Sequence, residues 1–311
     1  MTEGTEGLFA RTEEFPSPAA QARLDALVGL DETRDRLVAD AVVLLDPTFI
    51  NDWSTRVHGN VIPAVGALLD RTPLFIFAGD VGVGKTELAE VLGQAISREA
   101  DVEVTLYPLS LTARGRGAVG EMTTLLTRAF ERVGKDFAHA RRADGTAAVM
   151  GVLLVDEADA LAQSRELAQM HHEDRAGVNA LIRGIDGMRT DRLPVLTILC
   201  TNRLDAIDPA VRRRAAAVET FERPSHEQRA ELLTRLLAGT KLQPDDMDEI
   251  AAATGGTADR DYGYTYSDLR QRLVPEIALT AYRRGVAIDK AIALEVTART
   301  LPTRPFELTG R

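Results

Sequence analysis

The stretch LFIFAGDVGVGKTELAEVLGQAIS, residues 74–97, decides the fold. It opens with a wholly apolar run, LFIFAG (74–79), which is typical of a strand buried in a parallel sheet. A glycine-rich loop follows, and after it Leu88, Leu92 and Ile96 recur at helical spacing. The order of strand, glycine loop and helix indicates an α/β fold with a ligand site at the loop.

The loop matches the phosphate-binding pattern G-x-x-x-x-G-K-[ST]. Its glycines let backbone N–H groups turn toward phosphate oxygens, and the N-terminus of the next helix adds the positive end of its dipole. We expect Lys85 to reach the β- and γ-phosphates of ATP and Thr86 to bind Mg²⁺. The predicted nucleotide-binding residues of this segment are Gly79, Asp80, Val81, Gly82, Val83, Gly84, Lys85, Thr86 and Glu87.

Four more strands are predicted downstream, alternating with helical segments. They are VTLYPL (104–109), VMGVLLVDEAD (149–159), VLTILCTN (195–202) and AVETFE (217–222). The alternation predicts an α/β sheet with helices on both faces, and beyond Arg223 the pattern is almost wholly helical. We therefore predict four parts: a flexible arm (1–24), a large α/β nucleotide-binding domain (25–222), a small helical lid domain (223–300) and a tail (301–311).

Acidic and amide side chains stand where two of these strands end. Asp156 and Glu157 end the third strand, and Asn202 follows the fourth. Ligands of open α/β sheets bind at the carboxyl ends of the strands, so we expect these side chains at the nucleotide. Asp156 can hold Mg²⁺ through water, Glu157 can accept a proton from the attacking water, and Asn202 can orient that water. A solvated acidic turn is the alternative for the carboxylates.

Three consecutive arginines, Arg212, Arg213 and Arg214, follow an Asp-Pro turn in an acidic chain with 47 Asp and Glu against 37 Lys and Arg. Adjacent cations repel one another, which indicates an anion nearby. An arginine supplied to a phosphoryl group in transfer can be worth on the order of 10³–10⁵ in rate. Because the run lies beyond the fourth strand, away from its own loop, we expect it to face a neighbouring subunit's nucleotide. A solvated turn or a structural ion pair is the alternative.

Composition excludes several classes of protein. No stretch approaches the roughly 18 apolar residues that a membrane helix needs. The single cysteine, Cys200, excludes an intramolecular disulfide and fits a reducing cytosol. The net charge of −10 argues against a general affinity for nucleic acid or an anionic membrane. We therefore expect a cytoplasmic protein.

Over residues 25 to 300 these motifs resemble the AAA+ ATPases. The residues that carry the resemblance are GDVGVGKT (79–86), LLVDEAD (153–159), VNALIRGIDGM (178–188), CTNRLDAIDPAVRRR (200–214) and GYTYSDL (263–269). The resemblance implies a P-loop fold with a five-stranded parallel sheet sandwiched by helices, a helical lid, and ATP bound between the subunits of a homo-hexamer. It also implies that Asn202 is the first sensor.

The same resemblance assigns two further nucleotide contacts. The segment Val28, Gly29 and Leu30 is expected to touch the adenine. The lid position that usually carries a second sensor arginine is Ser267, and Arg270, one turn later, is expected to substitute.

Two registers compete for the arginine finger. The usual D-P-A-L-x-R pattern places the finger at Arg213. Residues 210–224 and the helix DRAGVNALIRGID (174–186) also resemble the pachytene-checkpoint AAA+ remodellers, which act on HORMA-domain proteins. That register runs without gaps and places the finger at Arg214.

The expected pore loop, RGRGAVGEM (114–122), departs from the pattern of threading ATPases. Those proteins carry an aromatic residue shortly before a Gly-Glu pair, where this chain has Ala118 and Val119. Alanine offers little surface for packing on a polypeptide. Either the protein pulls weakly, or Arg114 and Arg116 bind an acidic client segment; a plain flexible loop is the alternative.

The resemblance predicts an ATP-hydrolysing hexamer that partly unfolds or disassembles a protein client. Bacterial short forms of the subgroup suggest a HORMA-domain protein in antiphage signalling as the client. A Rubisco-activase-like activase stays open as an alternative. A DNA-related loader would need a basic DNA-facing element, and a non-catalytic nucleotide switch would not need Asp156, Glu157 and Asn202 together.

Overall fold

The computed structural model of the 311-residue chain describes residues 8, 9, 11–110, 121–161 and 173–306. The chain separates into two compact units. The first comprises Met1–Ala26, Glu32–Ala78 and Thr86–Thr220, and the second comprises Leu27–Asp31, Gly79–Lys85 and Phe221–Arg311. The sequence predicts one division between domains, near residue 223. The two units instead alternate along the chain, because residues 79–85 of the nucleotide loop belong to the second unit.

The first unit is built on a six-stranded sheet in the order β1-β3-β4-β5-β2-β6. Its strands are β1 (Glu13–Phe15), β2 (Thr72–Gly79), β3 (Glu103–Ser110), β4 (Val149–Asp156), β5 (Val195–Thr201) and β6 (Ala215–Phe221). Strands β3, β4, β5 and β2 pair in parallel, with Val155 opposite Leu199 and Thr201 opposite Ala78. The five strands predicted from the sequence are present, and the carboxyl ends of β4, β5 and β2 share one edge.

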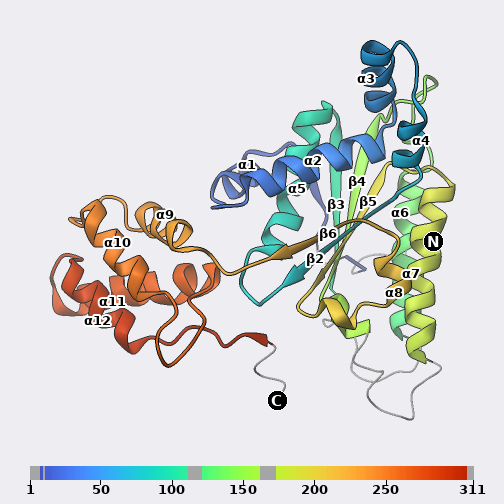
Figure 1. Cartoon of the computed structure of the whole chain (residues 1–311). Coiled ribbons are helices and arrows are strands. Elements are labelled where there is room, and N and C mark those ends of the chain that lie inside the picture. The colour runs from blue at the N-terminus through green and yellow to red at the C-terminus, as the bar shows by residue number, and fades with distance from the viewer. Residues whose placement is uncertain (1–7, 10, 111–120, 162–172, 307–311) are drawn as a thin grey trace. The chain divides into compact units, whose positions relative to one another are not determined.

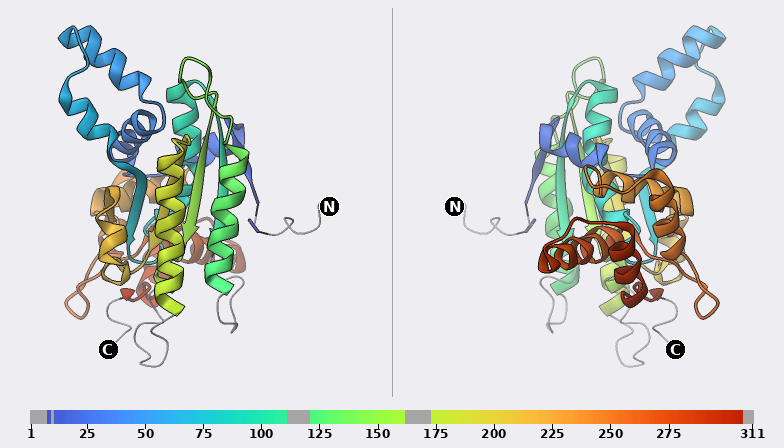
Figure 2. Two further views of the ribbon diagram at one scale, coloured as in Figure 1. Left: turned by 90° about the vertical axis from the view of Figure 1, so that its right-hand side faces the viewer. Right: turned by 90° about the vertical axis from the view of Figure 1, so that its left-hand side faces the viewer.

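Helices cover both faces of this sheet (Figure 1). α2 (Asp31–Leu45) and α5 (Lys85–Ala100) lie on one side, and α6 (Glu121–Asp136) and α7 (Glu173–Thr190) lie side by side on the other (Figures 1 and 2). Leu88, Leu92 and Ile96 of α5 are fully buried, as their spacing predicts. On the opposite face, residues from α6 and α7 form one apolar core with β4, including Leu126, Phe130, Leu181, Ile185, Leu153 and Val155.

Part of the segment predicted as a flexible arm forms regular structure. Residues 13–15 form β1, which pairs antiparallel with β3, and α1 (Pro18–Asp25) follows. Phe15 is only 1% exposed and fills the space that Gly93 of α5 leaves, since a Cβ at Gly93 would lie 2.6 Å from the ring. Ser17 caps α1 through its side chain and donates its N–H to Gln94 at 2.8 Å. One buried aromatic ring and a capped helix thus order a segment whose composition is polar.

Shorter elements complete the first unit. α3 (Thr48–His58) and α4 (Pro63–Leu69) form a hairpin that extends beyond the sheet (Figure 2). The 3₁₀ turn η1 (Ala158–Leu161) follows β4. A second 3₁₀ turn, η3 (Leu204–Ala206), and α8 (Pro209–Arg212) connect β5 to β6. None of the helices in the described part of the chain is long and apolar enough to cross a membrane.

The second unit is helical from residue 226 onward, as the sequence predicts. Its elements are α9 (His226–Leu236), α10 (Pro244–Ala253), the π-helical turn η4 (Asp268–Leu273), α11 (Val274–Arg284) and α12 (Lys290–Arg299). Its core gathers around the buried ring of Tyr264, whose hydroxyl donates to the carbonyl of Thr297 at 3.2 Å. Pro275 has no N–H to donate to the preceding turn, which accounts for the widened turn before α11.

Candidate functional site

The predicted phosphate loop joins β2 to α5, and its residues 79–85 belong to the second unit. Gly79, Gly82 and Gly84 have φ angles of 145°, 78° and 98°, a range that residues with side chains rarely adopt. The Nζ of Lys85, a buried residue, donates to the carbonyls of Gly79 at 2.9 Å and Asp80 at 2.6 Å. α5 begins at Lys85, so the N-terminus of a helix follows the loop directly and can hold an anion.

Contacts within the second unit also place the other residues predicted to contact nucleotide. Leu30 lies beside Gly84, where an added Cβ would be 3.4 Å from its Cδ1. Gly29 accepts a hydrogen bond from the side chain of Gln228 at 3.3 Å, and Val28 is buried in the core of this unit. The segment 28–30 is therefore packed between the loop and α9, which suits an adenine contact.

The lid position Ser267 contacts the loop through its backbone. Its N–H donates to the carbonyl of Gly82 at 3.1 Å. Arg270 is exposed on η4, and its side chain has no hydrogen-bond or ion-pair partner among the described residues. Its role as second sensor stays a prediction.

In the first unit, Thr86 and Asp156 come together. Thr86 is the second residue of α5 and Asp156 is the last residue of β4, and Thr86 Oγ1 lies 3.4 Å from Asp156 Oδ1. A Mg²⁺ ion bound by Thr86 keeps several waters, and at this separation Asp156 could accept a hydrogen bond from one of them. The two oxygens therefore fit a magnesium site that Thr86 binds directly and Asp156 binds through water.

Glu157 has a left-handed backbone, with φ of 56°. Its N–H donates to Asp156 Oδ1 at 2.9 Å, so the carboxylate predicted to hold the metal also fixes the turn after β4. A non-glycine residue in this region costs of order 1 kcal/mol or more and is often found at active sites. Glu157 directly follows β4, so its turn lies at the same sheet edge as Asp156, where a proton acceptor is predicted.

Asp159 is a site residue that the sequence analysis did not assign. It is 8% exposed, and its Oδ1 accepts from Thr201 Oγ1 at 3.3 Å and from the N–H of Asn202 at 3.4 Å. Thr201 in turn accepts the N–H of Arg203 at 3.0 Å. Asp159 therefore ties the turn that carries Asn202 to the strand end that carries Asp156. The sequence shows Asp159 as the last residue of the motif LLVDEAD, but its partner Asn202 lies 43 positions further along the chain, so no local pattern reveals the contact.

The three arginines lie in different environments. Arg214 makes a two-pronged ion pair with Asp186 of α7, at 3.0 and 3.1 Å, and donates to the carbonyl of Ala210 at 3.0 Å. The hydrogen bonds that Arg214 donates to Asp186 raise the pKa of Arg214 above its ordinary value. Arg213 is exposed, and the described residues offer its side chain no partner. The alternative that we kept for the run, a structural ion pair, thus applies to Arg214 alone.

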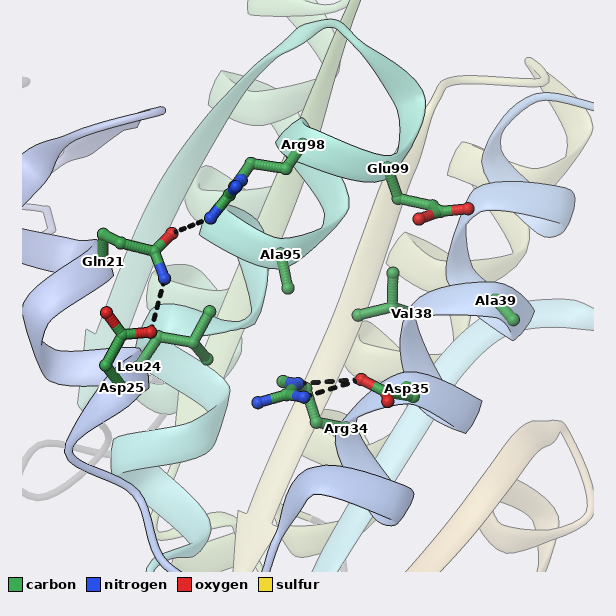
Figure 3. Close-up of a pocket in the computed structure, with 10 residues that line it drawn as sticks. All are labelled: Gln21, Leu24, Asp25, Arg34, Asp35, Val38, Ala39, Ala95, Arg98 and Glu99. Atoms are coloured by element: carbon green, nitrogen blue, oxygen red, sulfur yellow. Dashed lines mark hydrogen bonds and ion pairs between the residues drawn. The ribbon is translucent and has the colours of Figure 1, made fainter.

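One described feature lies apart from this constellation. A pocket of about 680 Å³ lies between α1, α2 and α5 (Figure 3). Its polar side chains bind one another: Arg98 donates to Gln21 at 2.8 Å and Gln21 donates to Asp25 at 2.7 Å. None of the predicted site residues lines the pocket. The arginines and the Ala118-Val119 pair predicted for the pore loop lie outside the described residues.

Comparison with known proteins decides the family. The family model "ATPase family associated with various cellular activities (AAA)" matches residues 75–223. Over 299 residues the chain is 48% identical to CD-NTase-associated protein 6 of Escherichia coli (strain MS 115-1), with 96% of each chain covered. The chain belongs to the AAA ATPase family.

Two solved structures resemble this AAA ATPase over nearly its whole length. A chain of the E. coli MS115-1 HORMA:CdnC:Trip13 complex has a TM-score of 0.87 and 47% identity, covering 96% of this chain and 97% of that one. Rhizobiales Trip13 has a TM-score of 0.74 and 39% identity, covering 96% and 100%. The predicted AAA+ fold is confirmed, with β1 as a sixth strand, and family membership establishes nucleotide binding and ATPase activity.

Proposed function

We propose that this AAA ATPase is a hexameric protein remodeller that acts on a bacterial HORMA-domain protein in antiphage signalling. The observation that carries the proposal is the 47–48% identity to CD-NTase-associated protein 6 and to a chain of the HORMA:CdnC:Trip13 complex, over at least 96% of each chain. ATP hydrolysis would drive partial unfolding or disassembly of the client. Cys200 is the single cysteine of the chain and is buried, which suits a reducing cytoplasm.

The nucleotide roles follow the local geometry of each unit. The loop N–H groups and Lys85 would bind the phosphates of ATP, and Val28 to Leu30 would contact the adenine. Thr86 and Asp156 would hold Mg²⁺, which neutralises charge on the phosphates. The separation of 3.4 Å between their oxygens supports this assignment.

The hydrolysis roles belong to the sheet edge. Glu157 would accept the proton of the attacking water, and Asn202, held by Asp159, would orient that water. Arg213 would reach the γ-phosphate of the adjacent subunit. Its exposure and lack of a partner among the described residues favour it over Arg214, which binds Asp186 of its own chain.

The central experiment combines Glu157→Gln with a client assay. We expect this variant to bind ATP and to lose turnover by at least about 10²-fold, because general-base catalysis typically contributes 10²–10⁴. Glu131→Gln, on the exposed face of α6, is the matched control and should leave turnover unchanged. Unchanged turnover in Glu157→Gln would remove the residue from the base role.

The client arm uses the E. coli MS115-1 HORMA:CdnC complex as the probe. The wild-type protein with ATP should separate the two partners on size-exclusion chromatography, and Glu157→Gln should retain the complex without separating it. Robust ATPase activity with no separation would refute the HORMA client while leaving the enzyme intact. Loss of activity in the wild-type protein would instead refute the ATPase assignment.

A further inference from the structure

The second residue of the phosphate loop, Asp80, carries a negative charge in a segment expected to bind an anion. A carboxylate there repels phosphate oxygens. It can also accept hydrogen bonds from the loop N–H groups that phosphate needs, since short acidic side chains readily bond nearby backbone. Asp80 Oδ1 already accepts the N–H of Val81 at 2.8 Å. An unrestrained Asp80 would therefore compete with the nucleotide.

The structure holds both oxygens of this carboxylate. Oδ2 accepts from Arg223, with Nε at 2.9 Å and Nη2 as a second donor. Oδ1 accepts the backbone N–H of Phe306 at 3.0 Å. The side chains of Asp80 and Arg223 are 16% and 14% exposed, so the pair is largely shielded from water. Every contact lies within the second unit.

The donor at Phe306 belongs to residues 301–306, which we name the C-terminal strap. The strap is anchored at Thr303, whose N–H donates to Asp268 Oδ2 at 3.0 Å and whose hydroxyl donates to Oδ1 at 2.7 Å. The carbonyl of Thr303 also accepts from Arg223 Nη2 at 2.9 Å. Arg223 thus binds the loop and the strap with one guanidinium group, which links the two segments.

We propose that the C-terminal strap is a positioning element for nucleotide: with Arg223 it fixes the Asp80 carboxylate so that, among the N–H groups of the described loop, it binds that of Val81 and leaves the others to phosphate, which raises the affinity of the loop for ADP and ATP. The inference rests on the proposed role of residues 79–86 in binding phosphate. The coupling is reciprocal, because a strap that favours bound nucleotide must itself be stabilised by nucleotide.

The test compares Phe306→Pro with Phe306→Ala in the full chain. Both remove the ring, but only proline removes the N–H that Asp80 accepts. We expect Phe306→Pro to bind ADP about tenfold more weakly than Phe306→Ala by titration calorimetry, which corresponds to about 1.4 kcal/mol. Equal affinities would overturn the proposal. Should the proline variant fold poorly, chains ending at Phe306 and at Pro302 provide a second pair with the same expected difference.

A double-mutant cycle separates positioning from general stabilisation. In an Asp80→Ala background the carboxylate is gone, so Phe306→Pro and Phe306→Ala should bind ADP equally. A tenfold difference that persists would mean that the strap acts elsewhere, and would refute the role of Asp80. Failure of the wild-type protein to bind ADP would refute the nucleotide site itself, which is a distinct outcome.

Hydrogen exchange gives an independent reading of the coupling. Saturating ADP should slow exchange in the peptide that contains Phe306 in the wild-type protein. It should have no such effect in Asp80→Ala, which lacks the acceptor. Exchange that is insensitive to ADP in the wild-type protein would contradict the reciprocal coupling.

Discussion

Replacing Arg213 or Arg214 by alanine separates a residue that we propose serves a neighbouring subunit from one that binds its own chain. Arg213 is exposed and, within the described chain, has no partner, so its removal should leave the fold intact. Arg214 binds Asp186 and the carbonyl of Ala210, which fixes α8 against α7. We therefore expect loss of Arg213 to affect mainly catalysis and loss of Arg214 to affect mainly the packing of α8.

The magnitudes follow from these environments. Arg213→Ala should lower kcat by on the order of 10³ or more with little change in thermal stability, because an arginine at the transferring phosphoryl group is worth 10³–10⁵. The ion pair of Arg214 is 35% exposed on the arginine and 43% on Asp186. Such a pair contributes about 0–1 kcal/mol. We expect Arg214→Ala to lower kcat by less than about tenfold, through a less ordered α8.

The assay is a mixing experiment that tests action between subunits. Arg213→Ala and Glu157→Gln should each be inactive, but an interface that pairs the Glu157 of one with the Arg213 of the other should be complete. In a randomly mixed ring about a quarter of the interfaces have this composition, so about a quarter of the wild-type rate should return. Arg213→Lys is a further control, because lysine keeps the charge without the planar fork.

A mixture no more active than its components would refute completion of the site by a neighbour. A 10³-fold loss in Arg214→Ala together with a nearly normal Arg213→Ala would refute the choice of Arg213. It would instead support the gap-free sequence register.

Three further predictions concern residues that position the site. Asp159→Ala removes the acceptor of two long hydrogen bonds, at 3.3 and 3.4 Å, that hold the turn carrying Asn202. Steady-state assays should therefore show kcat about fivefold lower with KM for ATP unchanged. Gly82→Ala should lower the thermal midpoint and ADP affinity more than Gly59→Ala, because both glycines have φ near 80° but only Gly82 would place its Cβ within 2.7 Å of a neighbour. Burial raises the pKa of Asp268, but hydrogen bonds from two threonines outweigh it and lower the pKa below the ordinary value of 3.8. Its stabilisation is thus present above that pH and lost as the pH falls through the folded-state pKa. Asp268→Asn should lower the free energy of unfolding by about 1–3 kcal/mol at pH 7. In thermal unfolding, the difference in stability between the wild-type protein and the variant should disappear below about pH 4.

The sheet was predictable because its information is local. LFIFAG and VMGVLLVD are apolar runs of strand length bounded by turn residues, and the spacing of Leu88, Leu92 and Ile96 marks the buried face of α5 without reference to any distant residue. The placement of Asp156 and Asn202 at one edge follows from the parallel topology, which the alternation of strands and helices implies.

What the sequence did not reveal depends on partners far along the chain. Asp80 is held by Arg223 and Phe306, which are 143 and 226 positions away, and no local pattern links them. β1 has only three residues, and it is held in place by the packing of one buried side chain, Phe15, against Gly93. Composition alone therefore favoured a flexible arm, because one ring adds little apolar character to a polar segment.

The arginine run shows why adjacent like charges need not form one basic patch. In the described structure, Arg212 Nε is buried without a hydrogen-bond partner, Arg214 is neutralised by Asp186, and Arg213 is exposed without a partner. Mutual repulsion is relieved because the side chains occupy different surroundings, and an acidic chain of net charge −10 compensates the rest. A polyanion such as DNA would be bound by several cations on one face, whereas here one guanidinium group is available at the surface. One exposed arginine beside one paired and one partly buried arginine suits a single phosphoryl group better than a nucleic-acid backbone.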